Sequence, residues 1–463
     1  MSDTITAIAT PVGAGGINII RLSGPESLAI ATRLFQLKES SPTADPRTAG
    51  LEPQRATFGE IRDPATGQLV DEVLCTFFRA PKSYTCEDVV EIHCHGGALV
   101  ASKILQLTID QGARLAHPGE FTRRAFINGR LDLMQAEAVA DVIHAASDKA
   151  LTAALAQLQG KLSEKLNHLY EQLLSVLTQL EAAIDFPEEG LEFEQKQKLE
   201  TTTGDVQSEI LKLVESYRQG KILREGARVT LVGKPNTGKS SLLNALLNED
   251  RAIVTPLPGT TRDVLEERVR IKDIHIQIVD TAGLRHAPEA IEEHGVARAR
   301  SALASADMAL MIFDGSQPLD ANDELLIREV GLKPKLVIVN KCDLPPVMDV
   351  TDLLKKAHEA DVLHLSALTG EGLDHLVDAI HSFVMASGRS GEDSVITRER
   401  HRQALTEAYT ALDRVRSSLK NNLSEDLIAV DLNLALESIG GILGKTFVED
   451  MLDQIFNDFC IGK

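Results

Sequence analysis

Short apolar segments alternate with polar residues and with Gly and Pro over the first quarter of the chain. Residues 19–22, 70–78 and 89–93 are the clearest of these segments, and they are rich in Val, Ile, Phe and Leu. Such runs between turn-forming residues are typical of strands. The pattern predicts a small α/β domain at the N-terminus.

Helical spacing replaces this pattern further along the chain. Residues 133–184 repeat apolar positions every three or four residues and predict an almost unbroken helical run, and residues 194–223 predict a second run. The helical pattern returns from residue 397 to the end. We therefore expect helices from both sides of the central region to form one discontinuous bundle.

The central region has a different character, because residues 228–232 are β-branched and precede a Gly-rich turn. Strands are predicted at 274–279, 308–313, 336–339 and 362–365, with helical segments between them. This alternation indicates a doubly wound α/β domain inserted into the helical bundle. The expected domains are residues 1–126, 127–222, 223–385 and 386–463.

Composition places the chain among folded, soluble proteins. Its 463 residues include 43% hydrophobic and 25% charged residues, and the formal charge of -20 argues against global attraction to nucleic acid. Any RNA contact must therefore be local. The five scattered cysteines suit a reducing compartment. No signal peptide or run of about 18 apolar residues is visible, so we expect a cytoplasmic protein without membrane contact.

A phosphate-binding loop follows the strand at 228–232. Gly233-Lys234-Pro235-Asn236-Thr237-Gly238-Lys239-Ser240 has the required glycines, lysine and serine, and a helix is expected next. Backbone amides can surround phosphates, Lys239 adds positive charge, and the Ser240 hydroxyl can bind Mg²⁺. The predicted nucleotide contacts are Asn236, Thr237, Gly238, Lys239, Ser240 and Ser241.

The base is indicated by Asn340-Lys341-Cys342-Asp343. The Asp343 carboxylate can accept two N–H groups from guanine, a donor pair that adenine lacks, so GTP and GDP are favoured over adenine nucleotides. Ser366 and Ala367 lie after the last predicted strand and are expected to complete the base pocket.

Two further segments indicate a nucleotide-dependent switch. Asp280, Thr281, Ala282 and Gly283 end a predicted strand, so Asp280 can hold Mg²⁺ through water while the Gly283 amide meets the terminal phosphate. Thr260 or Thr261, in the preceding segment, can reach the metal when that phosphate is present. The fold class is therefore a multidomain protein: an N-terminal α/β domain, a discontinuous α-helical bundle and an inserted P-loop α/β GTPase domain.

The motifs leave several candidates for the residues that catalyse hydrolysis. Leu284 stands where many small GTPases have a water-orienting Gln. Positive charge at the transition state could come from Arg262 or Arg285. Water could be oriented by one of three acidic residues, each of which also reads as an ordinary solvated charge on a helix. These are Glu289, Glu292 and Glu293.

Three other motifs, read together with the nucleotide motifs, resemble the MnmE (TrmE) family of GTPases that modify the wobble uridine of tRNA. They are residues 83–88, residues 118–122 and the terminal Cys460-Ile461-Gly462-Lys463. The resemblance covers essentially the whole chain. It implies a potassium-dependent GTPase that forms a homodimer through its N-terminal domain, and a heterotetramer with an MnmG-type flavoprotein.

The resemblance also assigns roles in the GTPase domain. It implies that Ser240 and Thr261 hold Mg²⁺, and that Glu292 orients the attacking water. K⁺ is expected to act in place of an arginine finger, with Leu257 contributing only its backbone carbonyl. The residues implied for K⁺ are Asn236, Thr255, Leu257 and Thr260, and Thr255, Thr260 and Thr261 are also expected to contact nucleotide.

In the N-terminal domain the resemblance implies a site for a 5-formyltetrahydrofolate-type cofactor. The matching positions are Arg21, Glu87, Arg130 and Lys463. The family often has Lys where this chain has Arg130, and both provide positive charge for a glutamyl carboxylate. Arg21 follows an apolar segment, so the sequence equally allows a structural role for Arg21, in which it caps a sheet edge and binds no folate.

Two sulfur-containing segments allow competing interpretations. Cys460 taken alone would be an incidental thiol, whereas the resemblance implies a catalytic residue near the folate site. His93 and His95 would share one strand face and could bind a metal, but no further ligand cluster accompanies them.

The nucleotide motifs predict GTP hydrolysis, and the resemblance implies an enzyme that, with its flavoprotein partner, adds a (carboxymethyl)aminomethyl group to carbon 5 of the wobble uridine of certain tRNAs. The rival interpretation is an assembly switch, in which GTP controls a binding surface for ribosomes or membranes and no base is modified. Cys460 separates the two, because a switch has no need of that thiol.

Overall fold

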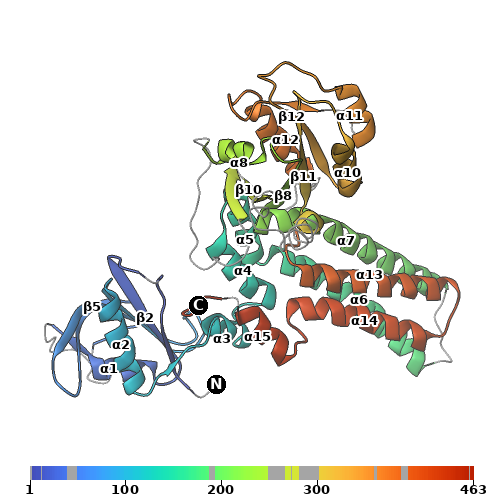
Figure 1. Ribbon diagram of the computed structural model, residues 1–463. Helices are drawn as coiled ribbons and strands as arrows, with labels where there is room; N and C mark the ends of the chain where they lie inside the picture. Colours follow the sequence, from blue (N-terminus) through green and yellow to red (C-terminus); the bar gives the residue numbers. More distant parts are fainter. Residues whose placement is uncertain are drawn as a thin grey trace, which may run out of the picture. The chain divides into compact units, whose positions relative to one another are not determined.

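A computed structural model describes most of the chain, and it divides the chain into two compact units. The described residues are 3–11, 13–38, 50–186, 193–248, 266–272, 274–280, 302–358, 362–386, 395–457 and 459–463. One unit comprises Met1–Ile143, Gln157–Leu191 and Asn422–Lys463, and the other comprises His144–Ala156 and Glu192–Asn421. Figure 1 shows the elements of both units.

The N-terminal part of the first unit is built on a seven-stranded sheet with the order β3-β4-β5-β6-β2-β1-β7. All neighbouring strands are antiparallel except β1 and β7. The strands are β1 (Ile5–Ile8), β2 (Ile17–Ser23), β3 (Phe35–Leu37), β4 (Ala56–Arg62), β5 (Leu69–Phe78), β6 (Val89–His95) and β7 (Arg114–Leu115).

Alternation along the central strands creates one buried face of this sheet. Ile20 and Leu22 of β2 and Val90 and Ile92 of β6 are fully buried, as expected when every second residue faces the core. Helices α1 (Ser27–Leu34) and α2 (Ala98–Asp110) cover this face. The predicted N-terminal α/β domain is therefore confirmed, and the strands expected at 19–22, 70–78 and 89–93 are β2, β5 and β6.

Eight of the described helices follow the N-terminal sheet or flank the central α/β domain. They are α3 (Glu120–Ile127), α4 (Leu133–His144), α5 (Asp148–Leu158), α6 (Lys161–Asp185), α7 (Phe193–Glu225), α13 (Glu399–Lys420), α14 (Glu425–Leu443) and α15 (Glu449–Asn457). The almost unbroken helical run expected over 133–184 consists of three consecutive helices, α4, α5 and α6, separated by short breaks. One break is at Gly160, whose φ of 88° is left-handed and suits glycine.

Helices from the two sides of the central domain pack together in pairs. In the first unit α6 packs against α14, and in the second unit α7 packs against α13. Leucines at helical spacing make the contact face of α6, including Leu166, Leu169 and Leu173, all buried. The discontinuous helical arrangement expected from the sequence is thus observed.

The second unit contains a six-stranded sheet with the order β13-β12-β11-β8-β10-β9. All pairs are parallel except β9 with β10. Its strands are β8 (Ala227–Val232), β9 (Glu266–Ile271), β10 (Ile274–Asp280), β11 (Met308–Asp314), β12 (Lys335–Asn340) and β13 (Leu363–His364), and its helices are α8 (Lys239–Asn248), α10 (Ala321–Val330), α11 (Val350–Ala357) and α12 (Leu373–Ala386).

This sheet confirms the predicted strand-and-helix alternation, with two differences. The strand expected at 362–365 is only Leu363–His364. Strand β9 was not among the strands predicted, because charged residues surround Val269 and Ile271. An edge strand buries little, so its hydrophobic signal is weak. Because the other strands are parallel, their carboxyl ends meet at one edge and place the following loops together.

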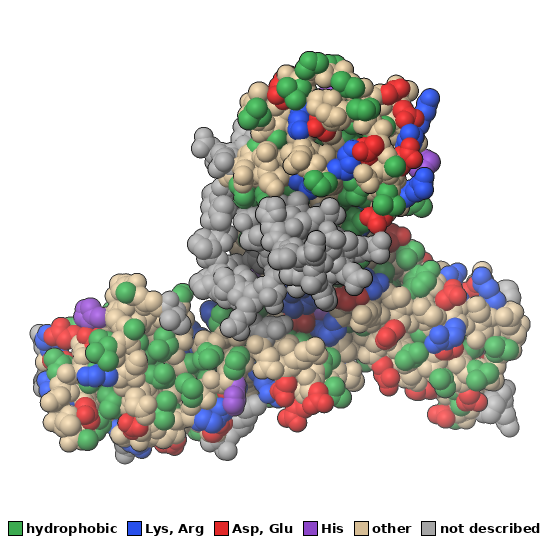
Figure 2. Space-filling view, viewed as in Figure 1, with side chains coloured by type: hydrophobic (Ala, Val, Ile, Leu, Met, Phe, Trp, Pro, Cys, Tyr) green, Lys and Arg blue, Asp and Glu red, His purple; other side chains and the backbone are tan. Residues whose placement is uncertain are grey.

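The surface mixes charges of both signs. Figure 2 shows Lys and Arg side chains interspersed with Asp, Glu and apolar side chains on the viewed face. Among the described helices, none combines the length and the apolar character needed to cross a membrane.

Candidate functional site

The loop between β8 and α8 has the backbone conformation of a phosphate cradle. Asn236 and Gly238 adopt left-handed φ angles of 66° and 94°, which let successive amides point to one side. A Cβ on Gly238 would lie 2.2 Å from Nδ2 of Asn340, so only glycine fits. Ser240 and Ser241 are exposed on the first turn of α8, with the Ser240 hydroxyl available to a hard cation.

Lys239, the second of the two lysines in this loop, is held by the loop itself. Its Nζ donates to the carbonyl oxygens of Gly233 at 2.9 Å and Lys234 at 2.6 Å, and its side chain is almost fully buried. The Thr237 hydroxyl donates to the same Lys234 carbonyl at 2.9 Å. The ammonium charge is therefore fixed beside the amides of the cradle, where a polyphosphate would need it.

Asn340 joins three of the predicted nucleotide loops. Its side-chain Nδ2 donates to the carbonyl of Thr237 at 2.8 Å, and its Oδ1 accepts from the amide of Ala367 at 3.0 Å. Asn340 and Ser366 are buried, whereas Asp343 is exposed. The buried amide fixes the loops and leaves the Asp343 carboxylate accessible to a ligand, as guanine recognition requires.

Lys341 has an acidic partner, Asp314, that no sequence motif indicates. Its Nζ lies 2.6 Å from Oδ2 of Asp314, at the end of β11. Burial opposes ionisation of Asp314, but Lys341 and Ser316 outweigh it and lower the pKa of Asp314. The pair holds the side chain of Lys341, whose backbone is left-handed with a φ of 66°.

Many predicted switch and metal residues lie outside the described residues. Asp280 is described only as the backbone end of β10. The others are Thr255, Leu257, Thr260, Thr261, Arg262, Thr281, Ala282, Gly283, Leu284, Arg285, Glu289, Glu292 and Glu293. The structure therefore describes the phosphate cradle and the base loops, and the proposed water and K⁺ positions remain predictions.

The second candidate site is centred on Arg21 in the N-terminal sheet. Arg21 lies on β2, between β1 and β6, so the alternative that it caps a sheet edge is wrong. Its guanidinium lies 2.8 Å from the carboxylate of Glu91, its register partner on β6. The same guanidinium lies 5.5 Å from the ring centre of Tyr84 and 5.6 Å from that of Phe121.

The last four residues of the chain lie against this site. Nη1 of Arg21 donates to the carbonyl of Gly462 at 3.3 Å, and the amide of Phe121 donates to Lys463 at 3.2 Å. Burial, followed by the charge of Arg21, lowers the pKa of Lys463. The Cys460 side chain is exposed. Arg21 and Lys463, predicted from distant parts of the sequence, are therefore brought together.

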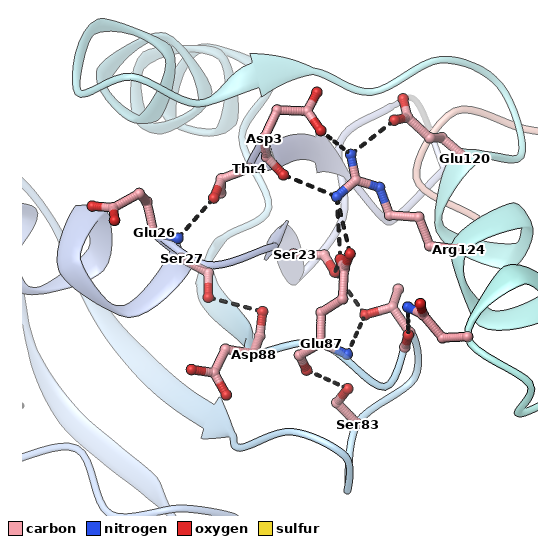
Figure 3. A network of polar contacts seen from close by, with 12 residues as sticks. Asp3, Thr4, Ser23, Glu26, Ser27, Ser83, Glu87, Asp88, Glu120 and Arg124 are labelled. Carbon is pink, nitrogen blue, oxygen red and sulfur yellow. Dashed lines mark hydrogen bonds and ion pairs between the residues drawn. The ribbon is translucent and has the colours of Figure 1, made fainter. Parts of the chain in front are cut away.

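Glu87 belongs to a buried polar network, shown in Figure 3. Its carboxylate accepts from Nη1 of Arg124 at 3.2 Å and from the hydroxyl of Ser23 at 2.6 Å. Arg124 is 1% exposed and also pairs with Asp3 at 2.9 Å and Glu120 at 3.1 Å. Three carboxylates and a buried guanidinium thus hold one another, and Glu87 has a fixed orientation.

Arg130 approaches the same aromatic ring as Arg21. Its Nη1 donates to the Tyr84 carbonyl at 2.6 Å, and its guanidinium lies 4.7 Å from the ring centre of Tyr84. The Tyr84 hydroxyl shares a hydrogen bond of 2.9 Å with Thr122. Cation–π contacts and the fixed hydroxyl hold this ring in place, and the site combines cationic and aromatic groups.

The two histidines on β6 have separate acidic neighbours. Nε2 of His93 lies 3.4 Å from Glu91, and Nδ1 of His95 lies 2.7 Å from Asp71. The part of the chain that the structure describes contains no group of three or more His, Cys, Asp or Glu residues able to hold a metal ion.

Several residues of these two sites were not predicted from the sequence. Glu91 could have been suspected, since Arg21 and Glu91 carry opposite charges on two predicted strands. Asp314 carries no such mark, because its partner Lys341 is distant in sequence. Arg124 has Glu120 four residues before it, but its other two partners, Asp3 and Glu87, are distant in sequence. Tyr84 stands inside a quoted motif, but its contacts with two arginines depend on tertiary structure.

Two family models together match almost the whole chain. The model described as "GTP-binding protein TrmE N-terminus" matches residues 4–130, and the model described as "MnmE helical domain" matches residues 133–460.

Curated relatives match over the full length. A protein named "tRNA modification GTPase MnmE" from Lactiplantibacillus plantarum is 44% identical over 464 residues, covering 100% of this chain and 98% of the relative. A protein of the same name from Moorella thermoacetica is 45% identical over 469 residues, covering 100% of both.

Solved structures are similar to part of the chain. Era from Aquifex aeolicus, bound to GDP and aluminium fluoride, is 29% identical and covers 40% of this chain and 66% of that one, with a TM-score of 0.28. The G domain of the T. maritima FeoB iron transporter is 26% identical and covers 34% of this chain and 99% of that one, with a TM-score of 0.27. These scores are too low to support an argument.

Proposed function

The chain belongs to the MnmE family of tRNA modification GTPases, and from this premise we propose that it couples GTP hydrolysis to modification of the tRNA wobble uridine. With an MnmG-type flavoprotein, in a heterotetramer, it adds a (carboxymethyl)aminomethyl group to carbon 5 of that base in certain tRNAs. The full-length match at 44% identity carries the proposal. The hydrogen bond from the Asn340 side chain to the Thr237 carbonyl supports the proposal, because this bond joins the phosphate loop to the base loop.

GTP and GDP are the proposed nucleotides. The left-handed loop and the buried Lys239 suit the phosphates, and the exposed Asp343 carboxylate suits guanine. Ser240 offers an exposed hydroxyl oxygen, a ligand type that Mg²⁺ prefers, and would hold the ion with Thr261. Bound Mg²⁺ neutralises phosphate charge during hydrolysis.

K⁺ is the proposed second cation, and the exposed Asn236 on the phosphate loop fits it by offering a side-chain oxygen. Thr255, Leu257 and Thr260 would complete the ligand set, and Glu292 would orient water. Bound K⁺ supplies positive charge beside the phosphates. Hydrolysis should slow sharply when Na⁺ replaces K⁺, since an oxygen cage suited to one ion need not serve a smaller one. Equal rates in both salts would remove K⁺ from the proposal.

A reduced folate of the 5-formyltetrahydrofolate type is the proposed ligand of the N-terminal site. Arg21, Arg130 and Lys463 provide cations for a glutamyl carboxylate, and the oriented Glu87 carboxylate can accept N–H groups from a pterin ring. When bound, the folate supplies a one-carbon unit. Calorimetric titration with 5-formyltetrahydrofolate checks this part, and absence of binding would remove it.

The proposed assembly is a homodimer formed through residues 1–126, the folate-binding part. Residues 127–222 and 386–463 form the helical domain, and residues 223–385 form the GTPase domain. The proposed location is the cytoplasm, where tRNA and the flavoprotein partner are available.

Wobble nucleosides provide the direct test of function. Cells that lack this protein should contain tRNA without the added group at carbon 5, measured by mass spectrometry of digested tRNA. Expression of the wild-type chain should restore the group. Normal modification in the deletion strain would refute the assignment.

The rival proposal, an assembly switch, is distinguished by Cys460. Its exposed thiol lies beside residues that contact Arg21, which favours a chemical role at the N-terminal site. Cys460→Ser should abolish tRNA modification and leave GTP hydrolysis unchanged. If both activities survive, the switch interpretation gains.

A further inference from the structure

Lys234, the second residue of the phosphate loop, is tied to the start of α10. Its Nζ lies 2.8 Å from Oδ2 of Asp320 and 2.7 Å from Oδ2 of Asp323. The Asp323 side chain is 2% exposed and that of Lys234 is 19% exposed. Because these charges are shielded from water, their attraction is screened less than that of a surface ion pair. The contact therefore holds the phosphate loop in a defined position.

The two acidic residues are themselves fixed by a capping box. Asp320 is the N-cap of α10 and accepts from the amides of Asn322 and Asp323, while the Asp323 carboxylate accepts from the amide of Asp320. Both carboxylates lie at the helix N-terminus, where negative charge is favoured. Lys234 is therefore anchored to a rigid part of the fold.

The backbone of Lys234 carries this anchoring to the phosphate-binding lysine. Its carbonyl accepts from Nζ of Lys239 at 2.6 Å and from the Thr237 hydroxyl at 2.9 Å. A displaced Lys234 would therefore displace the carbonyl that holds the ammonium of Lys239. These contacts connect Asp323, through Lys234, to the ammonium group of Lys239, which would face the phosphates of a bound nucleotide.

The segment that carries these acids also contacts the base loop. Asp314, where the segment begins, pairs with Lys341 at 2.6 Å, and the amide of Gly315 donates to the Asn340 carbonyl at 2.9 Å. Residues 314–323 therefore touch the base loop at one end and the phosphate loop at the other. Because this segment contacts both loops, we expect the ion pair of Lys234 with Asp323 to affect nucleotide binding and not only the stability of α10.

We propose that Lys234 and Asp323 are positioning residues for guanine-nucleotide binding, acting through Lys239. The inference rests on the proposed function, since it concerns the same nucleotide site. Because GTP and GDP both carry the phosphates that the cradle contacts, the pair should strengthen the binding of both. Binding that is equal in ground and transition states affects KM and leaves kcat unchanged.

The test uses the full-length chain with Lys234→Met, measured by titration with fluorescent GDP and a non-hydrolysable GTP analogue and by steady-state hydrolysis. We expect about tenfold weaker affinity for both nucleotides, with KM raised to match and kcat within about twofold. Lys234→Arg keeps the charge and should restore most of the affinity. Affinities of Lys234→Met within twofold of wild type would overturn the proposal.

Lys356→Met is the matched control. Lys356 pairs with Glu324 on α10 at 2.9 Å and with Asp352 on α11 at 2.7 Å, and so holds the same helix through another ion pair. It should leave nucleotide affinity unchanged. An equal loss in this variant would show that any loosening of α10 weakens binding, and would overturn the specific role of Lys234.

Asp323→Asn provides the second variant in case Lys234→Met fails to fold. An asparagine oxygen can still accept from the amide of Asp320, so the helix cap is kept. The ion pair of Lys234 with the buried Asp323 is lost, and its pair with the more exposed Asp320 remains. Asp323→Asn should weaken GDP and GTP binding in the same direction, and unchanged affinity would contradict the proposal. Failure of the wild-type chain to bind either nucleotide would instead refute the proposed function itself.

Discussion

The two candidate sites are built in different ways. The described nucleotide site consists of contiguous segments that each follow a parallel strand, and its shape comes largely from backbone, as at Gly238 and Lys341. The N-terminal site takes Arg21 from β2, Tyr84 and Glu87 from one loop, and Lys463 from the end of the chain. Contiguous sequence motifs are enough to identify the nucleotide site. The N-terminal site, in contrast, is assembled by contacts between residues that are distant in sequence.

The difference has an energetic side. The nucleotide loops need few buried charges beyond Asp323 and Lys239, and their carboxylate for the base, Asp343, is exposed. The N-terminal site depends on the fully buried Arg124. Substitutions in the nucleotide site should therefore change ligand affinity. Substitutions in the N-terminal site should change both ligand affinity and the free energy of unfolding.

The largest expected effect is a change of base specificity at Asp343. Asp343→Asn replaces an acceptor of two N–H groups by an amide, so GTP affinity should fall by about 10⁴-fold, while xanthosine nucleotides, which present an oxygen there, should gain. Competition binding with the two triphosphates checks this. Retained preference for GTP would place base recognition elsewhere.

Arg124→Gln should have the next largest effect. Removing the guanidinium leaves Glu87 without a cationic partner, whereas Asp3 and Glu120 keep Arg114. Unfolding of the N-terminal domain should therefore become easier by about 3 kcal/mol, the lower end of the cost of breaking a buried ion pair. Amide hydrogen exchange in β2 and β6 measures this. The neighbouring Arg123, with partly exposed partners such as Asp453, is the control, and Arg123→Gln should cost less than about 1 kcal/mol. Equal effects would contradict the special role of Arg124.

Gly462→Ala should disturb the placement of the C-terminal residues. Gly462 has a left-handed φ of 96°, and an added Cβ would lie 2.4 Å from the carbonyl oxygen of Ile8. We expect roughly tenfold slower tRNA modification with unchanged GTP hydrolysis. Gly441→Ala is the control, because its added Cβ would meet nothing within 4 Å. Slower hydrolysis in Gly462→Ala would show that the two sites are not separable.

The smallest effect concerns pH. Burial opposes ionisation of Glu120, but Arg114, the His117 amide and Arg124 outweigh it and lower the pKa of Glu120 below its usual value of 4.5. Its stabilising contribution is therefore present above that value and is lost as pH falls through the lower folded pKa. The difference in unfolding free energy between wild type and Glu120→Gln should stay constant near neutral pH and shrink below about 4.5. A constant difference throughout would exclude this contribution.

The sequence by itself determined the strands and helices of the central domain, because β-branched runs and glycine turns are local signals. It also identified the phosphate and base loops, whose chemistry is written in adjacent residues such as Gly238 and Lys239. The breaks in the helical run at 133–184 and the weak edge strand β9 escaped it. The polar residues at the helix breaks and within β9 gave no local signal that would have located a helix end or a strand.

Only the tertiary structure decided which distant charges meet. It placed Arg21 inside the sheet beside Glu91, brought Asp3 and Glu87 to Arg124, and joined Lys234 to the cap of α10. Ion pairs form between groups that the fold brings within a few ångströms, and separation along the chain does not predict that distance. Local patterns therefore determined the elements and the contiguous motifs, while the packing of those elements determined the electrostatic partners.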